Sequence, residues 1–167
     1  MPQPRSVDLS FRPLTPADAP HVRWALLAAL AWNPERQLPP DDVVLEHPEA
    51  ARYHDDWGRP GDIGVLAERD GDVVGVAYCR LFTEDDHGHG YVDERTPEIA
   101  IAVHEDARGT GLGAQLLNEL AALARAEGFE QLSLSVDTAN PAARLYERLG
   151  YREVFADADG RRMLLAL

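Results

Sequence analysis

A glycine-rich turn stands near the middle of the sequence, where Gly109, Gly111 and Gly113 follow Arg108 directly ahead of a helical pattern. The first turn of a helix leaves backbone N–H groups without partners, and the helix dipole adds partial positive charge there. Because glycine has no Cβ, an anion can approach these amides closely. The pattern therefore predicts a phosphate or pyrophosphate site, to which Arg108 adds charge. The residues assigned to this site are Arg108, Gly109, Thr110, Gly111, Leu112, Gly113 and Ala114.

Two common phosphate-binding motifs do not match this turn. A Walker A loop would continue with Gly-Lys-Ser/Thr, which does not follow these glycines. A dinucleotide-binding fingerprint has Gly-x-Gly-x-x-Gly spacing, whereas these glycines alternate and lie late in the chain.

The segments on either side of the turn predict regular structure. Ile99, Ile101 and Val103 alternate with small alanines, which is typical of a strand packed on both faces. After the turn, apolar residues recur at three- and four-residue spacing, which predicts an amphipathic helix that ends near Gly128. The sequence therefore predicts a strand, a glycine turn and a helix in direct succession.

Two stretches together resemble the GNAT family of N-acetyltransferases. In the first, Val103 precedes Arg108-Gly-Thr-Gly111-Leu-Gly113, similar to the family's strand that ends in Val ahead of Arg/Gln-x-x-Gly-x-Gly/Ala. The second, Asn140-Pro-Ala-Ala143-Arg-Leu-Tyr146-Glu-Arg-Leu-Gly150-Tyr151, resembles the family's helix with Asn, Ala and Tyr followed by Gly-Phe/Tyr. The resemblance covers residues 60–156 well and residues 1–60 only in general layout.

The resemblance implies that the turn binds the pyrophosphate of acetyl-CoA, the expected cosubstrate. It also implies that the backbone of Ile101, Ala102 and Val103 pairs with the pantetheine arm like an extra strand, while their side chains pack in the core. Asn140 matches the asparagine that hydrogen-bonds CoA in the family. Its alternative role is to cap the helix that begins at Pro141.

Acetyl transfer to an amine needs a base, because free alkylamines are mostly protonated at neutral pH. Glu98, at the start of the central strand, stands where the family often has a glutamate. Its rivals as base are Glu94, Asp93 and His104. Tyr146 matches the family's tyrosine in the last helix and is implied to protonate the departing thiolate. Its alternative role is to pack that helix onto the sheet.

The only cysteine, Cys79, lies in a predicted strand well before the CoA elements, so nothing supports a covalent acyl-cysteine route. The expected function is transfer of acetyl from acetyl-CoA to a primary amine by direct attack in a ternary complex. The sequence does not identify that amine. One alternative is a catalytically silent acyl-CoA-binding module that shares the turn. Another is a regulatory domain that uses the turn for ATP or NAD.

The rest of the sequence predicts short strands and helices before and after these two motifs. The predicted strands are residues 7–12, 63–68, 73–82, 99–103, 132–136, 151–155 and 161–165, and the predicted helices are 16–31, 41–46, 49–55, 112–127 and 141–149. Asp70-Gly71 predicts a hairpin turn, and Gly75 a bulge. The mixture indicates an α/β (α+β) fold in a single domain over residues 1–167. The resemblance implies a mixed, mostly antiparallel sheet of six to seven strands with about four helices.

Two irregular regions allow more than one interpretation. Residues 32–61 form either the wall of an acceptor pocket or a layer packed on the sheet. Their aromatic surplus consists of Trp32, Tyr53, His54 and Trp57. The polar loop of residues 83–95 contains His87 and His89, which are expected in a solvated turn rather than in a metal site. A part for Tyr91 or Asp93 in the acceptor site is left open.

Composition sets the remaining bounds. The chain has 167 residues, 45% of them hydrophobic, which suits one packed domain. A formal net charge of −13 argues against binding to nucleic acids or anionic membranes. It indicates an ordinary acidic, solvated surface, and it would also favour cationic acceptors such as amines. With a single cysteine and no recognisable leader or membrane-length apolar run, a cytoplasmic location is expected. A homodimer through an exposed edge strand near the C-terminus is left open.

Overall fold

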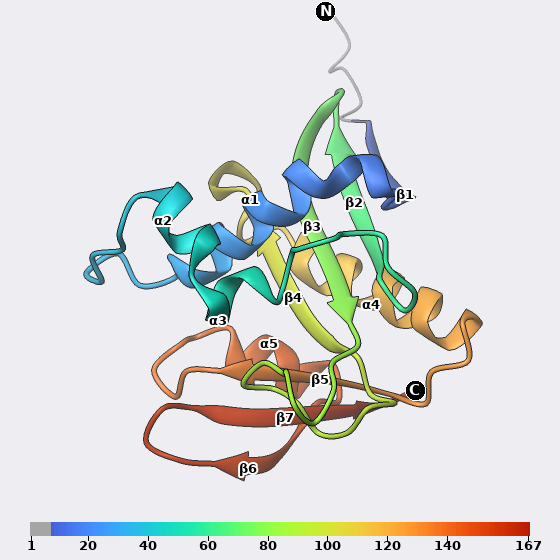
Figure 1. The fold of residues 1–167 in the computed structure, drawn as a ribbon. Coiled ribbons are helices and arrows are strands. Elements are labelled where there is room, and N and C mark those ends of the chain that lie inside the picture. Colours follow the sequence, from blue (N-terminus) through green and yellow to red (C-terminus); the bar gives the residue numbers. More distant parts are fainter. Residues whose placement is uncertain (1–7) are drawn as a thin grey trace, which may run out of the picture.

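The computed structural model describes residues 8–167, which form a seven-stranded sheet in the order β1-β2-β3-β4-β5-β7-β6 (Figure 1). The strands are β1 (Leu9–Pro13), β2 (Ile63–Arg69), β3 (Asp72–Arg80), β4 (Glu98–Val103), β5 (Gln131–Val136), β6 (Arg152–Ala156) and β7 (Arg161–Ala166). Only the β4–β5 pair is parallel, and the others are antiparallel. The predicted mixed, mostly antiparallel sheet is therefore confirmed.

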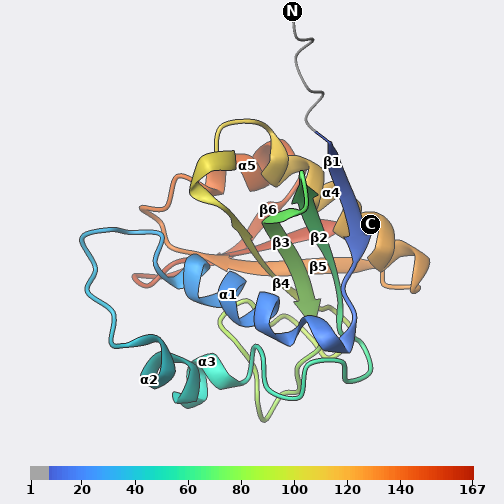
Figure 2. The same cartoon turned by 90° about the horizontal axis from the view of Figure 1, so that it is seen from above.

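Helices cover both faces of this sheet. They are α1 (Ala19–Leu30), α2 (Asp41–Glu46), α3 (Pro48–Ala51), α4 (Leu112–Ala126) and α5 (Ala143–Arg148), with 3-10 turns at Pro16–Asp18 and Glu105–Ala107. Figure 2 shows α1, α2 and α3 on one side of the sheet and α4 and α5 on the other. None of the helices described is long and apolar enough to cross a membrane.

Two apolar layers hold the helices to the sheet. On α4, Leu116, Leu117 and Leu120 are at most 2% exposed and pack in the larger core beneath the sheet. Burying a leucine side chain contributes about 1.5–3 kcal/mol, so this face of α4 fixes the helix that follows the glycine turn. On the other face, Val22 of α1 and Val76 of β3 lie in a second buried cluster.

The hairpin between β2 and β3 forms as predicted. Asp70 and Gly71 both have positive φ, 53° and 89°, as a two-residue hairpin turn of this hand requires. The pairing register skips Val74, so the strand bulges next to Gly75. A Cβ on Gly75 would lie 2.6 Å from Leu116 Cδ1, which explains the glycine at this contact with α4.

Several element boundaries differ from the predictions. A 3-10 turn precedes α1, because the Asp18 carboxylate accepts hydrogen bonds from the Thr15 amide and from Arg12 and fixes the first turn. α3 ends at Ala51 rather than at residue 55. Val7, expected in the first strand, lies outside the described residues. The exposed C-terminal edge is β6, because β7 is paired on both sides.

The feature of the sheet that matters most for function is the split between β4 and β5. These parallel strands share a single paired position, Glu98 with Ser133, at the start of β4. Figure 1 shows the two strands close at their beginnings and apart at their ends. Beyond Glu98, the edge of β4 that faces β5 is therefore open.

Candidate active site

The split between β4 and β5 leads into a cavity of about 1340 Å³. The predicted site residues that line it are Glu98, Ile101, Ala102, Val103, Arg108, Gly109, Gly111, Leu112, Gly113, Ala114, Asn140 and Tyr146. Thr110 is the exception, because its Oγ1 turns away and donates to the Ala107 carbonyl at 2.6 Å. The structure thus brings both sequence motifs to one cavity and gives Thr110 a role in closing the turn.

At one end of the cavity, the glycine turn presents backbone amides. Gly109 and Gly111 have φ values of 73° and 84°, which only glycine adopts without strain. Within residues 8–167, the amides of Gly109, Thr110 and Gly111 donate to no backbone carbonyl. A Cβ added to Gly109 or Gly111 would meet no heavy atom within 4 Å, so the space over these amides is open. This geometry is suited to an anion, and binding of a phosphate here stays a prediction.

Gly111→Ala is expected to weaken CoA binding at least about tenfold, equivalent to roughly 1.4 kcal/mol, because its Cβ enters the open space and φ is strained. Gly128→Ala is the matched control. Gly128 ends the same helix with φ of 89° and equally open surroundings but lies away from the cavity. Calorimetry with CoA checks both variants. An equal loss of affinity in both would show that strain alone matters.

Arg108 lies at the same end of the cavity. Its Nε donates to the Val103 carbonyl at 3.3 Å, and the side chain is exposed. This hydrogen bond holds the Nε side of the guanidinium at the end of β4. It leaves the two Nη groups available to solvent or to a ligand.

Arg108→Ala is expected to weaken acetyl-CoA binding by about 1–3 kcal/mol and to leave binding of acetyl-pantetheine nearly unchanged, because the lost bond is to phosphate. Competition binding with the two donors measures the difference. Arg125→Ala, at the exposed far end of α4, is the control. Equal weakening for both donors would assign Arg108 a structural role.

Asn140 follows β5 and begins the turn into α5. Its Oδ1 accepts a hydrogen bond from the Ala142 amide at 2.9 Å. The bond closes a turn two residues on, ahead of α5, which begins at Ala143 rather than at Pro141 and has Ala142 as its N-cap. The alternative role as N-cap of a helix beginning at Pro141 is therefore wrong. The contact of Asn140 with CoA stays a prediction, for which the amide nitrogen is the available group.

Glu98 lies at the other end of the cavity and is only 3% exposed. Its carboxylate lies against the 88–90 backbone: a Cβ on Gly88 or Gly90 would be 2.6 or 2.5 Å from its oxygens. Within residues 8–167, Oε1 is buried without a hydrogen-bond partner. Burial raises the pKa of Glu98 to about 7, and the groups that oppose this rise are Tyr53, the Gly90 amide, Arg162 and Arg52. A carboxyl with this pKa can take up a proton near neutral pH.

Tyr53 places a hydroxyl beside Glu98. This hydroxyl accepts a hydrogen bond from the His89 amide at 3.1 Å, and the ring packs edge-on against Phe82. Burial and the nearby Glu98 charge raise the pKa of Tyr53, so the hydroxyl keeps its proton and can donate to the carboxylate. The aromatic surplus in residues 32–61 was the signal that pointed here.

The four residues of that surplus do not all reach the cavity. Trp32 and Tyr53 line it, as the pocket-wall interpretation expects. His54 instead contacts the Leu45 carbonyl through Nε2, and Trp57 donates to the Thr15 carbonyl and packs on Tyr78. For these two, the packing interpretation is correct.

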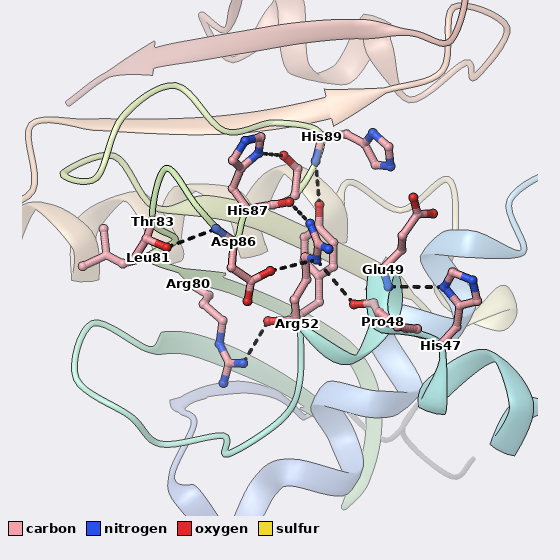
Figure 3. A network of polar contacts seen from close by, with 12 residues as sticks. His47, Pro48, Glu49, Arg52, Arg80, Leu81, Thr83, Asp86, His87 and His89 are labelled. Atoms are coloured by element: carbon pink, nitrogen blue, oxygen red, sulfur yellow. Dashed lines mark hydrogen bonds and ion pairs between the residues drawn. The ribbon is translucent and has the colours of Figure 1, made fainter.

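A buried arginine holds the segment that contains Tyr53. Arg80 pairs with Asp62 through two contacts of 2.9 and 2.8 Å, and both side chains are fully buried. Arg80 also donates to the carbonyls of Arg52 and Asp55. Arg52 in turn donates to the carbonyls of Pro48 and His87 (Figure 3). This network links β3 to α3 and to the 87–89 loop, and so fixes the surroundings of Glu98.

The 83–95 loop contributes more to the cavity than the sequence predicted. His87 and His89 both line the wall, and the His87 ring stacks on Tyr91 at 4.3 Å. The sequence pattern predicted only a solvated turn for them, because their place in the wall depends on contacts with Arg52 and Tyr53, which follow α3. Among residues 8–167 there is no cluster of three or more His, Cys, Asp or Glu side chains suited to a metal ion.

Only one of the four candidate bases lines the cavity, and it is Glu98. Asp93 accepts from the Arg95 amide, and Glu94 accepts from the Glu84 amide elsewhere in the loop. His104 lies beyond the end of β4, where its Nδ1 accepts from the Asp106 amide. The geometry thus favours Glu98 over its rivals.

Tyr146 lies on α5 with its ring edge-on to Tyr151, at 5.8 Å between centroids, and it also lines the cavity. The residue therefore packs α5 onto the core and faces the ligand space at once. Burial raises the pKa of Tyr146 to about 12. The phenol is thus protonated at neutral pH and can donate.

Comparisons with known proteins agree with this geometry. The model of the acetyltransferase (GNAT) family matches residues 24–151, which starts earlier than the region of clear resemblance in the sequence. A mycothiol acetyltransferase of Thermobispora bispora is 34% identical over 130 residues, covering 72% of this chain and 43% of that protein. A mycothiol acetyltransferase of Streptomyces coelicolor is 30% identical over 155 residues, covering 90% of this chain and 45% of that protein.

Solved structures share the fold. The crystal structure of a ribosomal-protein-alanine N-acetyltransferase from Brucella melitensis superposes with a TM-score of 0.65 at 25% identity. The superposition covers 95% of this chain and 99% of that one. By contrast, the chain spans less than half the length of the two curated relatives. The family match nevertheless extends over most of the chain and confirms the recognition made from the two motifs: the protein belongs to the GNAT family of acetyltransferases.

Proposed function

We propose that the protein transfers acetyl from acetyl-CoA to a primary amine by direct attack in a ternary complex. The observation that carries this proposal is that the amide-rich turn and the buried Glu98 carboxyl open onto the same cavity. The turn suits the pyrophosphate of CoA, and the open edge of β4 suits the pantetheine arm. The thioester then lies between the two ends of the cavity.

In the proposed reaction, each proton transfer is assigned to one residue. Glu98 accepts the proton of the attacking amine, directly or through water, since its Oε1 is a buried acceptor without a partner among the described residues. Tyr146, protonated at neutral pH, donates to the departing thiolate. Cys79 is fully buried in β3 and burial raises the pKa of its thiol, which supports direct attack over an acyl-cysteine route.

The test is release of CoA from acetyl-CoA with a panel of amines at pH 8. Turnover that depends on an amine, with the acetylated amine detected by mass spectrometry, is the expected result. Binding of CoA without turnover on any amine would support the silent acyl-CoA-binding module instead. Thermal stabilisation by ATP or NAD but not by CoA would favour the regulatory domain.

Homodimerisation, a cytoplasmic location and the absence of nucleic-acid partners stay predictions. For the dimer, the supporting feature is β6, an edge strand whose five residues are all exposed. Val154 and Phe155 of this strand are 46% and 51% exposed. Edge-to-edge pairing of two β6 strands is the arrangement proposed, and sedimentation of the wild type beside a Val154→Lys variant measures it.

A further inference from the structure

Arg162, on β7, presents a guanidinium to the Glu98 end of the cavity. Its Nε donates to the His89 carbonyl at 3.2 Å, and its Cζ lies 5.3 Å from the centre of the Phe155 ring. The side chain is half-buried. Two contacts thus fix the guanidinium in place before any ligand binds.

The sheet register places Arg162 on the same face as Glu98. Glu98 pairs with Ser133, and Ser133 pairs with Leu164, so these three share one face. Arg162 stands two positions from Leu164 on β7 and therefore projects from that face as well. The His89 carbonyl that Arg162 contacts also belongs to the loop that wraps the Glu98 carboxyl. The guanidinium and the candidate base thus meet at one end of the cavity.

Arg162 differs from neighbouring arginines because it forms no salt bridge with a carboxylate within residues 8–167, although its charge lowers the pKa of Glu98. Arg161, next to it, pairs with Glu147 and Glu153. Arg52 is 3.5 Å from Asp86. The Nη groups of Arg162 donate to no acceptor among the described residues. In a protein with a net charge of −13, a fixed guanidinium without a salt bridge in a cavity can bind an anion.

The anion at this site is not a phosphate of CoA, because the phosphate-binding turn lies at the far end of β4. Glu98 and Val103 are five residues apart on that strand, which corresponds to about 16 Å. Three aspartates line the cavity wall, Asp137, Asp157 and Asp159, and the first two accept hydrogen bonds from backbone amides of their own turns. None of the three forms a salt bridge with Arg162. The charge of Arg162 lowers the pKa of Glu98, but no salt bridge joins the two side chains, and the Nη groups of Arg162 are available to an anionic group on the acceptor.

We propose that the acceptor is a small amine that also carries a carboxylate, such as a free amino acid, and that Arg162 binds this carboxylate while the amine faces Glu98. This inference rests on the proposed function. Arg52 lines the same wall and adds positive charge there. A planar guanidinium binds a carboxylate through two parallel hydrogen bonds, which would also orient the amine.

The test compares matched acceptors with the wild-type protein. Each of the twenty common amino acids is assayed beside its carboxamide and its decarboxylated amine, with CoA release as the readout. The expected result is that kcat/KM for at least one amino acid exceeds that of its carboxamide by about tenfold or more, the value of a charge-assisted bond. The carboxamide has the more acidic amine and more of it is unprotonated, so this preference runs against the bias from amine pKa.

Variants then assign the preference to one side chain. Arg162→Met is expected to lower kcat/KM for the preferred amino acid about 10- to 100-fold more than for its carboxamide, with the KM for acetyl-CoA nearly unchanged. Loss of the nearby positive charge also raises the pKa of Glu98, and this effect is shared by both acceptors. Arg162→Lys is expected to restore part of the preference, because it keeps the charge and loses the bidentate geometry. Arg152→Met is the control, since Arg152 is exposed on β6 and does not line the cavity.

The outcomes separate this inference from the proposed function. If amines without a carboxylate are acetylated as well as their matched amino acids, the acceptor inference is wrong and the acetyltransferase stands. If Arg162→Met weakens acetyl-CoA binding instead of the acceptor preference, Arg162 belongs to the donor site. If no amine of any class supports CoA release, the proposed function itself fails.

Discussion

Glu98→Gln is expected to lower kcat roughly 100- to 10,000-fold at neutral pH, the range for loss of a general base. The amide keeps the size of the side chain in a space that is only 3% exposed, but it cannot take the proton. Activity should recover in part at high pH, where the amine loses its proton without help. The wild-type rate should rise with pH through about 7, the pKa to which burial raises Glu98. Stopped-time assays from pH 6 to 10 measure both profiles.

Glu94→Gln is the matched control for this experiment. Glu94 lies in the loop before β4 and does not line the cavity, so its variant should keep the wild-type profile. A Glu98→Gln enzyme with an unchanged pH–rate profile would exclude Glu98 as the base. If Glu94→Gln instead lost activity, the base would lie in the 83–95 loop.

The same carboxyl gives a check on folding that does not depend on activity. The folded-state pKa of about 7 lies above the ordinary glutamate value of 4.5, so folding favours the protonated form. Its stabilising contribution is complete below pH 4.5 and is lost as the pH rises through 7. Glu98→Gln should therefore match the wild-type melting temperature at pH 4.5 and exceed it at pH 8. A lower melting temperature at pH 8 would show that ionised Glu98 is well compensated in the fold.

Tyr146→Phe is expected to lower kcat by roughly 10- to 1,000-fold with little change in acetyl-CoA affinity, because phenylalanine fills the same space and cannot protonate a thiolate. Single-turnover assays measure the chemical step apart from product release. Tyr151→Phe is the control, since Tyr151 is the edge-on partner of Tyr146 and its hydroxyl is buried away from the cavity. Full activity in Tyr146→Phe would make Tyr146 a packing residue.

Local sequence patterns were sufficient for most elements of this fold. Asp70-Gly71 requires two positive φ values, and few structures other than a hairpin turn supply them. The glycine turn ahead of Leu112 is equally local, because its amides belong to neighbouring residues. What the sequence could not supply was the order of the strands. β7 pairs with β5 and leaves β6 at the edge, which depends on long-range packing rather than on any local pattern.

The candidate site likewise has one end that depends on local sequence and one end that depends on long-range packing. The sequence could indicate the proposed CoA end because its residues are adjacent in the chain and match known motifs. The acceptor end joins Tyr53, His89, Glu98 and Arg162, which come from four separate segments. Glu98 was indicated by the family resemblance, and Tyr53 by the aromatic surplus around it. Arg162 looks like any polar residue of a strand until the register of β7 places it beside Glu98.

The single pairing between β4 and β5 has a consequence for how the two substrates bind. Glu98 belongs to the part of the sheet formed by β1–β4, and Arg162 belongs to the part formed by β5, β7 and β6. The proposed acceptor site therefore spans two parts of the sheet that are joined at one paired position. A pantetheine arm that paired with the backbone of Ile101 and Val103 would bridge the two parts where β4 and β5 do not pair. It would thereby reduce their relative motion. We expect slower hydrogen exchange at these amides when CoA is present, and a compulsory order of binding in which the donor enters before the acceptor.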